Sequence, residues 1–184
     1  VTRKNHQGVI AWISLVEFQS VENLLPGIFE KGEEPLFIVL DGVSDVRNFG
    51  AIVRSAECLG AHAIVIPEKG SARINADAVK TSAGALHTFP VCRVKAITRT
   101  VEFLKESGLK IIAASEKRGT LASDICLTGP AALIMGSEDK GVGPELLSMA
   151  DHHVMIPMTG KIGSLNVSVA AGILIYEIIR QRGA

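Results

Sequence analysis

The sequence predicts an α/β fold with a Rossmann-like, mostly parallel sheet. Short apolar runs alternate along the chain with longer segments whose apolar residues recur at helical spacing. Glycine and proline separate these segments, and strands that alternate with helices are typical of a parallel sheet with helices on both faces. The 184 residues, 47% of them hydrophobic, are enough for one domain with a buried core.

The expected elements follow in chain order. The first is an amphipathic helix over residues 15–25, which Pro26 and Gly27 end. The expected strands are residues 36–40, 63–66, 89–94, 109–114, 131–135 and 153–156. The expected helices are residues 49–59, part of 75–86, 97–106 and 164–181.

Two segments divide the chain in this scheme. Residues 1–30 are expected to be a linker and the N-terminal helix, because residues 2–8 are polar and lack periodicity. Residues 31–184 form the expected main domain. The chain starts at Val1 rather than at a methionine, and we expect a further domain upstream.

Composition argues against several classes of protein. The 19 basic and 19 acidic residues balance, whereas a stand-alone nucleic-acid-binding protein usually has an excess of Lys and Arg. No apolar run approaches the roughly 20 residues of a membrane-spanning helix. Cys58, Cys92 and Cys126 are odd in number and far apart, and the adjacent His152 and His153 point to opposite sides of a strand. We therefore expect a cytoplasmic protein without disulfides, metal or a membrane partner.

The first loop to inspect follows residue 40, because ligands bind beyond the carboxyl ends of strands in α/β sheets. Asn48 in this loop is a candidate N-cap of the next helix. Arg54 lies about 100° round that helix from Val53, at the edge of the apolar stripe. Taken alone, Arg54 is a surface arginine.

The second loop, after residue 135, reads Gly136-Ser137-Glu138-Asp139-Lys140-Gly141-Val142-Gly143-Pro144. Its glycine spacing is similar to that of a phosphate loop, but the Lys-Ser/Thr pair is missing and two carboxylates repel phosphate. The dinucleotide fingerprint also fails, because Leu146 stands where its last glycine belongs. Either a ligand loop or a glycine-rich turn, with Pro144 at the first helical position, fits the pattern.

The third loop follows residue 156 and leads into the last expected helix. Ser164 is a candidate N-cap, with Asn166 and Ser168 in the first turns. A cap accounts for Ser164, but it does not account for the alternation of three small polar residues with apolar ones at the start of this helix. The loop is therefore also a candidate to hold a polar ligand.

The three loops together, in this order, resemble the signature motifs of the SpoU/TrmH methyltransferases of the SPOUT superfamily. The resemblance covers about residues 33–176, which is most of the chain. It is carried by Asn48-x-Gly50-x3-Arg54, by Gly136-x-Glu138-x2-Gly141, and by Pro157-Met158 followed by Ser164-Leu165-Asn166-Val167-Ser168-Val169-Ala170.

This resemblance implies a C-terminal trefoil knot, a homodimer with the active site near the subunit interface, and S-adenosylmethionine as cofactor. The implied reaction is methylation of a ribose 2′-hydroxyl in RNA. The catalytic residues that it implies are Arg54, Asn48, Glu138, Ser164 and Asn166. The implied cofactor-binding residues are Gly136, Glu138, Gly141, Ile156, Met158, Leu165 and Asn166.

The role of Arg54 stays open between two possibilities. A guanidinium with a pKa above 12 is a poor base at neutral pH and needs a large pKa shift to act as one. Otherwise Arg54 positions the ribose and stabilises the developing alkoxide through charge-assisted hydrogen bonds. We favour the positional role.

The RNA substrate is inferred from the segment near the start of the chain. Residues 6–8 resemble the linker of relatives that carry a small N-terminal RNA-binding domain, and these relatives often act on ribosomal RNA. We therefore favour 23S-type ribosomal RNA, and expect this chain alone to bind RNA weakly. The alternatives are a tRNA 2′-O-methyltransferase, a non-catalytic RNA-binding relative and a Rossmann-like nucleotide enzyme. Lys117-Arg118 is either a solvated turn or an RNA contact.

Overall fold

The computed structural model describes residues 16–115 and 119–183. The polar segment 2–8, Leu15 and the pair Lys117-Arg118 lie outside the described residues. The elements run in the order β1 (Phe18–Gln19), α1 (Val21–Glu30), β2 (Leu36–Asp41), α2 (Val46–Cys58), β3 (Ala63–Pro67), α3 (Ala76–Thr81), η1 (Ala85–His87), β4 (Val91–Val94), α4 (Ile97–Glu106), β5 (Lys110–Ala114), β6 (Thr120–Leu121), η2 (Ala122–Asp124), β7 (Ala131–Gly136), α5 (Pro144–Met149), β8 (His152–Met155) and α6 (Val167–Gln181).

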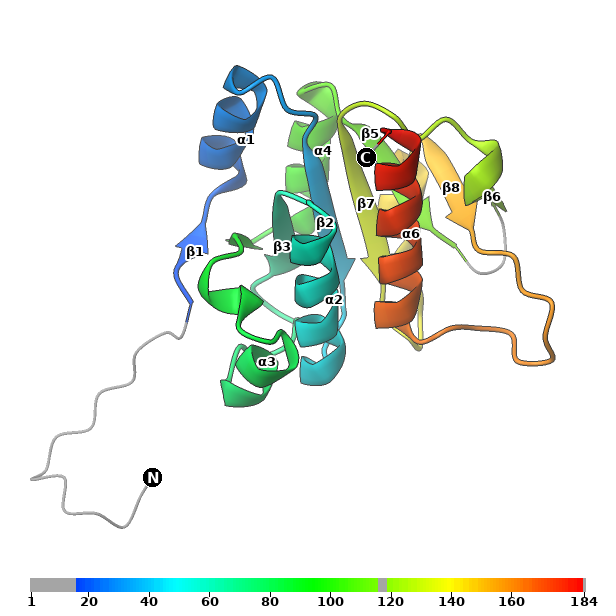
Figure 1. Cartoon of the computed structure of the whole chain (residues 1–184), viewed down its shortest axis with the longest axis horizontal. Helices are drawn as coiled ribbons and strands as arrows, with labels where there is room; N and C mark the ends of the chain where they lie inside the picture. Colours follow the sequence, from blue (N-terminus) through cyan, green and yellow to red (C-terminus); the bar gives the residue numbers. More distant parts are fainter. Residues whose placement is uncertain (1–15, 116–118, 184) are drawn as a thin grey trace, which may run out of the picture.

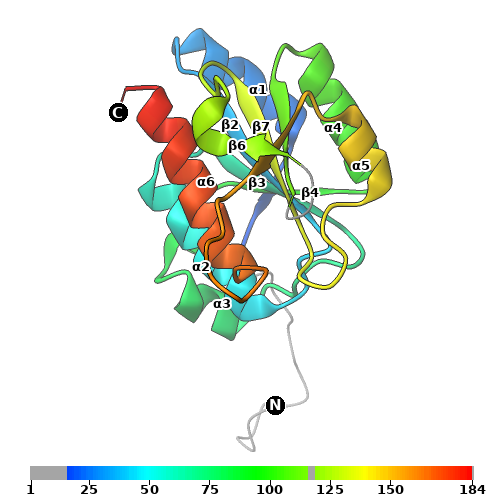
Figure 2. The same cartoon turned by 90° about the vertical axis from the view of Figure 1, so that its right-hand side faces the viewer.

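The strands form one sheet in the order β1-β4-β3-β2-β7-β5-β8-β6. Every pairing between the strands of the described part is parallel. Helices α2, α3 and α6 cover one face of the sheet, and α1, α4 and α5 cover the other (Figures 1 and 2). The predicted Rossmann-like α/β architecture is confirmed, and the trefoil knot stays a prediction.

Strand β2 shows how the sequence builds two cores at once. Leu36, Ile38 and Leu40 point into the core beneath α2 and α6, and the intervening Phe37 and Val39 point into the core beneath α1 and α4. Side chains alternate between the two faces of a strand, so an uninterrupted apolar run is what a strand covered on both faces requires.

The prediction for the first helix is wrong in both its start and its end. Helix α1 begins after Ser20, whose side chain accepts a hydrogen bond from Asn23 N, and it continues through Pro26 to Glu30. The residues before it include the edge strand β1 instead of a helical turn. Buried Val21, together with Leu25 and Ile28 one and two turns later, packs on the sheet, and this burial outweighs the hydrogen bond that proline removes.

The other predicted elements are confirmed, with shifts of a few residues at their ends. The expected helix over 75–86 is α3 followed by a turn of 3-10 helix. Helix α5 begins at Pro144, as the turn interpretation of the second loop predicted. The short strands β1 and β6 were not predicted, because two-residue edge strands have no periodicity to detect.

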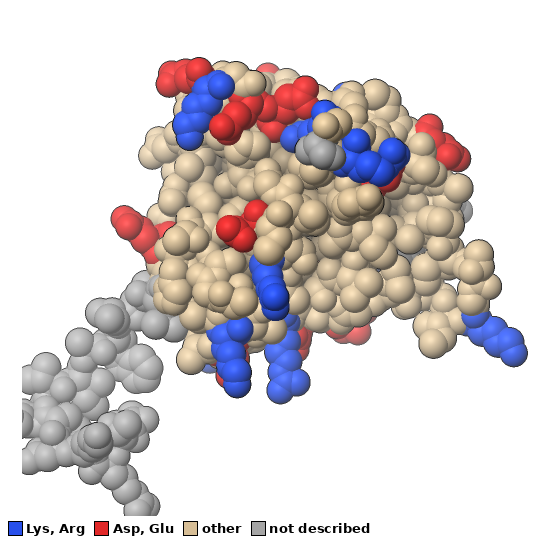
Figure 3. All heavy atoms as spheres, in the orientation of Figure 1, with Lys and Arg blue, Asp and Glu red and all other residues tan. Residues whose placement is uncertain are grey.

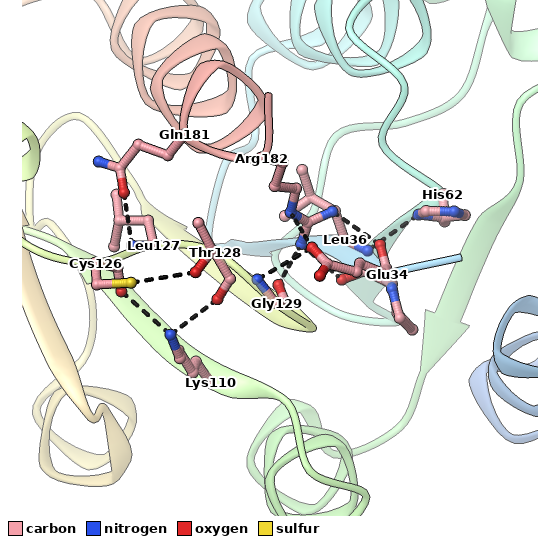
Figure 4. A network of polar contacts seen from close by, with 11 residues as sticks. Glu34, Leu36, His62, Lys110, Cys126, Leu127, Thr128, Gly129, Gln181 and Arg182 are labelled. Atoms are coloured by element: carbon pink, nitrogen blue, oxygen red, sulfur yellow. Dashed lines mark hydrogen bonds and ion pairs between the residues drawn. The ribbon is translucent and has the colours of Figure 1, made fainter. Parts of the chain in front are cut away.

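A polar network closes the amino end of the sheet, where β2 and β7 begin (Figure 4). The guanidinium of Arg182, just after α6, donates to the carbonyl oxygens of Glu34 (2.8 Å), Pro35 (3.1 Å) and Gly129 (2.6 Å). Its Nε lies 3.4 Å from the Glu34 carboxylate, an ion pair without hydrogen-bond geometry. The end of α6 is thereby held to two loops from distant parts of the chain.

No helix among residues 16–115 and 119–183 is long and apolar enough to cross a membrane.

Candidate active site

Strand register brings the first two loops together. Strands β2 and β7 are neighbours, with Leu40 opposite Met135 and Asp41 opposite Gly136, so both chains leave the sheet at the same level. The Asp41 carboxylate then accepts a hydrogen bond of 2.7 Å from Gly143 N and ties the two loops. The first and second motifs therefore lie side by side, although about 90 residues separate them.

Helix α2 begins three residues earlier than predicted, so Asn48 lies inside the helix and is not its N-cap. The N-cap is Asp45, whose Oδ1 accepts hydrogen bonds from Arg47 N (2.9 Å) and Asn48 N (2.8 Å). The expectation that Asn48 is the N-cap is wrong, because the Asp45 carboxylate already satisfies these backbone donors. The Asn48 side chain is left to contact the second and third motifs.

The loop after β7 folds back on itself in a tight turn. Gly141 N donates to the carbonyl oxygen of Ser137 (2.8 Å), and Gly141 adopts a positive φ of 68°. A Cβ on Gly136 would lie 2.0 Å from the Gly141 carbonyl carbon, so only glycine fits at position 136. The turn presents Glu138 at its tip.

The third loop forms no regular structure before α6 begins. Within the described residues, no backbone hydrogen bond involves 157–165, so their N–H and C=O groups are left for water or a ligand. Asn166, and not Ser164 as predicted, caps α6: its Oδ1 accepts hydrogen bonds from Ser168 N (2.9 Å) and Ser168 Oγ (2.6 Å). Ser164 lies two residues before this cap and is exposed.

Three side chains, one from each motif, form a hydrogen-bonded network. Asn48 Nδ2 donates to Glu138 Oε1 (2.8 Å). Asn166 Nδ2 donates to the same oxygen (3.1 Å) and to Asn48 Oδ1 (3.0 Å). One carboxylate oxygen thus accepts hydrogen bonds from two side-chain amides. The network joins the loops after β2 and β7 to the start of α6.

A cavity of about 880 Å³ lies beyond the carboxyl ends of β5, β7 and β8. This large cavity is lined by the second and third motifs and by the loop after β5. All seven predicted cofactor-binding residues line it: Gly136, Glu138, Gly141, Ile156, Met158, Leu165 and Asn166. Ser164 also lines it, whereas Asn48 and Arg54 do not.

A second cavity of about 290 Å³ lies on the other side of the 137–140 turn. This small cavity is formed between the loop after β2, the start of α2 and that turn. Its lining residues are Gly42, Val43, Ser44, Asp45, Asn48, Ser137, Glu138, Asp139, Lys140 and Val167. The stretch from Ser137 to Lys140, together with Val167, borders both cavities.

Arg54 stands apart from both cavities. It is exposed on α2, about 9 Å along the helix and about 240° round from Asn48. In the described part of the chain its side chain makes no hydrogen bond or ion pair. The structure therefore brings four of the five predicted catalytic residues to the cavities and leaves Arg54 on the outer surface of α2.

Sequence reasoning missed the end of β5 and the loop after it, which give Ala114, Ser115 and Gly119 to the large cavity. A Cβ on Gly119 would lie 2.8 Å from the carbonyl oxygen of His153, so this chain passes close to β8. The signal was present, because residue 114 ends a predicted strand and is followed by polar residues and a glycine. Only the strand order shows that this loop belongs to the same site.

Among the described residues, no group of three or more His, Cys, Asp or Glu side chains is arranged to hold a metal ion. The two histidines of β8, at 152 and 153, lie on opposite sides of the strand, and only His153 borders the large cavity.

The fold and the site define a class of protein. A parallel sheet with helices on both faces, carrying a ligand-sized cavity at its carboxyl end, is the arrangement of an α/β enzyme. The sequence profile of the SpoU rRNA Methylase family matches residues 35–176. The chain therefore belongs to this family, as the three motifs predicted.

Curated relatives match along nearly the whole chain. The 23S rRNA (guanosine-2′-O-)-methyltransferase RlmB of Yersinia pestis is 39% identical over 178 residues, which are 97% of this chain and 72% of the relative. The RlmB of Escherichia coli strain K12 is 38% identical over 177 residues, or 96% of this chain and 72% of the relative.

Solved structures show the same fold. The SpoU methyltransferase AviRb from Streptomyces viridochromogenes, in complex with the cofactor AdoMet, is 30% identical with a TM-score of 0.74, over 81% of this chain and 61% of that one. The A. aeolicus TrmH/SpoU tRNA modifying enzyme is 32% identical with a TM-score of 0.74, over 88% of this chain and 84% of that one. This chain thus spans less than two thirds of the AviRb chain.

Proposed function

We propose that this chain transfers a methyl group from S-adenosylmethionine to a ribose 2′-hydroxyl of RNA, with 23S-type ribosomal RNA as the favoured substrate. The observation that carries the proposal is the network of Asn48, Glu138 and Asn166. It joins the three motifs at the boundary between the two cavities, where a donor in one and an acceptor in the other would meet.

The large cavity fits S-adenosylmethionine by size and by chemistry. About 880 Å³ lies within the range of roughly 300–1,000 Å³ that is typical of small-molecule sites. Ile156, Leu165 and Leu174 offer apolar surface for the adenine ring. The unpaired backbone groups of 157–165 and the close turn at Gly136 offer hydrogen bonds and near approach for the polar parts of the cofactor. When bound, the cofactor supplies the activated methyl group on its sulfonium.

The side-chain network orients the ribose. Glu138 Oε1 already accepts from both amides, so its second oxygen is left to accept a hydrogen bond from a ribose hydroxyl. Asn48 and Asn166 hold this carboxylate in place, and Ser164, exposed at the cavity wall, contacts the cofactor or a neighbouring phosphate. Fixing the acceptor in a reactive geometry is the main contribution that such residues make to catalysis.

Arg54 stabilises the acceptor oxygen as its proton leaves to water. A guanidinium stays charged at neutral pH and donates charge-assisted hydrogen bonds, so it acts on the developing alkoxide rather than as the base. Since Arg54 lies outside both cavities of its own chain, it completes the site across a subunit interface.

The dimer that this requires has a candidate surface on α6. Val169 (49% exposed), Ile173 (40%) and Tyr176 (56%) form an apolar stripe along one side of this helix. Helix α6 packs on α2 where Gly172 approaches Ser55, one residue from Arg54. A second copy seated on the stripe therefore reaches the neighbourhood of Arg54. Ile173→Glu should convert the dimer to a monomer in sedimentation; an unchanged mass would contradict this interface.

Ribosomal RNA is favoured over tRNA because the RlmB relatives are named for 23S rRNA. The A. aeolicus neighbour, a tRNA modifying enzyme, supports tRNA as the second candidate. Although the net charge is zero, Lys and Arg side chains gather at the lower edge of the face in Figure 3, below α2. Strands β2 and β7 point toward this edge in Figure 1, and it is the side from which RNA phosphates can approach. The free cysteines of the described part suit a cytoplasmic enzyme.

Two measurements test the proposal. Calorimetry with S-adenosylhomocysteine should give a dissociation constant in the micromolar range, about −8 kcal/mol at 1 μM. Labelled S-adenosylmethionine should then methylate unmodified 23S ribosomal RNA transcripts faster than tRNA transcripts. Absence of binding at millimolar ligand would contradict the cofactor assignment, and preference for tRNA would replace the favoured substrate by the second candidate.

A further inference from the structure

The segment between β8 and α6 stands out from the body of the fold, at the right-hand side of Figure 1. Its two ends line the large cavity, with Met158 at one end and Gly163 and Ser164 at the other. The four residues between these ends, 159–162, are exposed and line neither cavity. These four residues, here called the tip, are therefore joined at both ends to the wall of the large cavity without being part of it.

No hydrogen bond holds the tip in place among residues 16–115 and 119–183. The backbone of 157–165 forms none, and the side chains of Thr159 and Lys161 form neither a hydrogen bond nor an ion pair. A Cβ on Gly160 or Gly163 would have no atom within 4 Å, so there is open space around both glycines. Glycine also adopts the widest range of backbone conformations. The tip can therefore change conformation at low cost, because few contacts have to be broken.

The tip carries the most exposed large apolar side chain of the described part of the chain. Ile162 is 78% exposed, whereas the other exposed large apolar residues range from 36% to 56%. It is flanked by Gly163 and lies four residues after Met158, both of which line the large cavity. Since removal of an isoleucine side chain from water is favourable, a conformation that covers Ile162 gains stability from its burial.

We propose that the tip is a lid that closes over the large cavity when the cofactor binds, and that Ile162 is the side chain that this closure buries. The inference rests on the proposed function, because the lid covers the cofactor of that function. The tip turns about Gly160 and Gly163 toward a cavity whose wall offers apolar surface from Ile156 and Leu165. Closure excludes water from the reacting groups, and the lid has to open again before the demethylated product leaves.

Limited digestion with trypsin reads the position of the lid. Trypsin cleaves after Lys161 in the tip, and an exposed segment without hydrogen bonds is a preferred site of cleavage. Saturating S-adenosylhomocysteine should slow cleavage of the bond between Lys161 and Ile162 about tenfold or more, because the closed segment must open before it is cut. Cleavage after Lys69, in the exposed loop that follows β3 and lines neither cavity, is the internal control and should keep its rate.

A substitution tests the role of the apolar side chain. Ile162→Ser should raise the dissociation constant for S-adenosylhomocysteine about tenfold, mostly through faster dissociation, because burial of the side chain stabilises only the closed complex. The protection of the bond after Lys161 should decrease with it, and Ile162→Leu should restore both quantities. Phe29→Ser, an exposed apolar residue on α1 that lines neither cavity, is the matched control and should leave the dissociation constant unchanged.

The outcomes separate this inference from the proposed function. A parent protein that does not bind S-adenosylhomocysteine at millimolar ligand would overturn the cofactor assignment and the lid together. Binding without protection of the bond after Lys161, or a parental dissociation constant for Ile162→Ser, would overturn the lid alone. Sedimentation of Ile162→Ser should give the mass of the parent. A smaller mass would assign Ile162 to the subunit interface and contradict the proposal.

Discussion

The two ends of the sheet use polar side chains in opposite ways. At the amino end, Arg182 and Gln181 bond to backbone groups of loops that they hold in place. At the carboxyl end, Asn48, Glu138 and Asn166 bond mainly to one another, between two cavities. The side chains at the amino end therefore stabilise the fold. Those at the carboxyl end still have donors and acceptors that can bind a ligand. Substitutions at the two ends should therefore separate stability from methyl transfer.

The largest expected effect is on methyl transfer by Arg54→Ala. Loss of one charge-stabilising donor typically reduces the rate about 10²- to 10³-fold, and we expect a decrease of that size. The unfolding free energy should change by less than about 0.5 kcal/mol, because the side chain is exposed. Single-turnover methylation and urea unfolding measure the two effects. Arg99→Ala, exposed on α4 across the sheet, is the control, and near-parental transfer by Arg54→Ala would remove Arg54 from the site.

The next effect belongs to the amino end. Arg182→Met leaves the carbonyl oxygens of Glu34 and Gly129 without their donor, whereas Pro35 O keeps the hydrogen bond from Ala131 N, and the change should destabilise the fold by about 2–3 kcal/mol. Methyl transfer at a temperature well below unfolding should stay near the parental rate. Arg180→Met is the matched control. Arg180 is half exposed, and among the residues that the structure describes its side chain bonds only to Glu177, so a small loss of stability is expected. Equal destabilisation by both variants would contradict the role given to Arg182.

A smaller effect is expected at the site from Asn166→Asp. The aspartate keeps the oxygen that caps α6 but replaces the Nδ2 donor with a second carboxylate beside Glu138. Methyl transfer should fall about tenfold, equivalent to about 1.4 kcal/mol, while stability changes by less than about 1 kcal/mol. Asn75→Asp, at the cap of α3 and outside both cavities, controls for the loss of an amide cap. Parental transfer by Asn166→Asp would show that the amide donor is not needed.

The smallest effect is a pH dependence of stability at the amino end. Burial lowers the pKa of His62, and its Nδ1 accepts a hydrogen bond of 3.0 Å from Leu36 N, so the folded protein holds the ring neutral. The unfolded chain binds the proton more tightly. The stabilisation that the neutral His62 ring gives the folded state is therefore fully present above the unfolded pKa of about 6.5. It is lost as the pH falls through the lower pKa that His62 has in the folded protein. Urea midpoints of the parent should fall from pH 7.5 to pH 5.5, and His62→Asn should flatten this change; an equal slope in both would exclude His62.

The parts of the site that sequence could predict are those whose chemistry is local. The strand ends at 40, 135 and 156 mark the three loops, and Asn48, Glu138 and Asn166 fall within them. Their mutual contact depends on β2 lying beside β7, a pairing that no local pattern contains. For the same reason the loop after β5 and the small cavity were not foreseen.

Local rules failed where a neighbour changed their outcome. Pro26 ends a helix in isolation, but the buried residues on either side of it hold α1 together. Asn48 is a good cap, yet Asp45 takes that position and releases Asn48 for the site. Gly50 lies in the first motif, and it is close packing that requires it, since a Cβ there would lie 2.8 Å from the Ala78 carbonyl oxygen of α3.

The position of the transferred methyl group tests the central claim most directly. A methyl on the ribose 2′-oxygen removes the nucleophile that alkali needs to cleave the adjoining phosphodiester, whereas a methyl on a base does not. Ribosomal RNA transcripts labelled with this protein and digested in alkali should therefore yield the label in resistant dinucleotides. Label recovered in mononucleotides would place the methyl on a base and contradict a site built to hold a ribose hydroxyl.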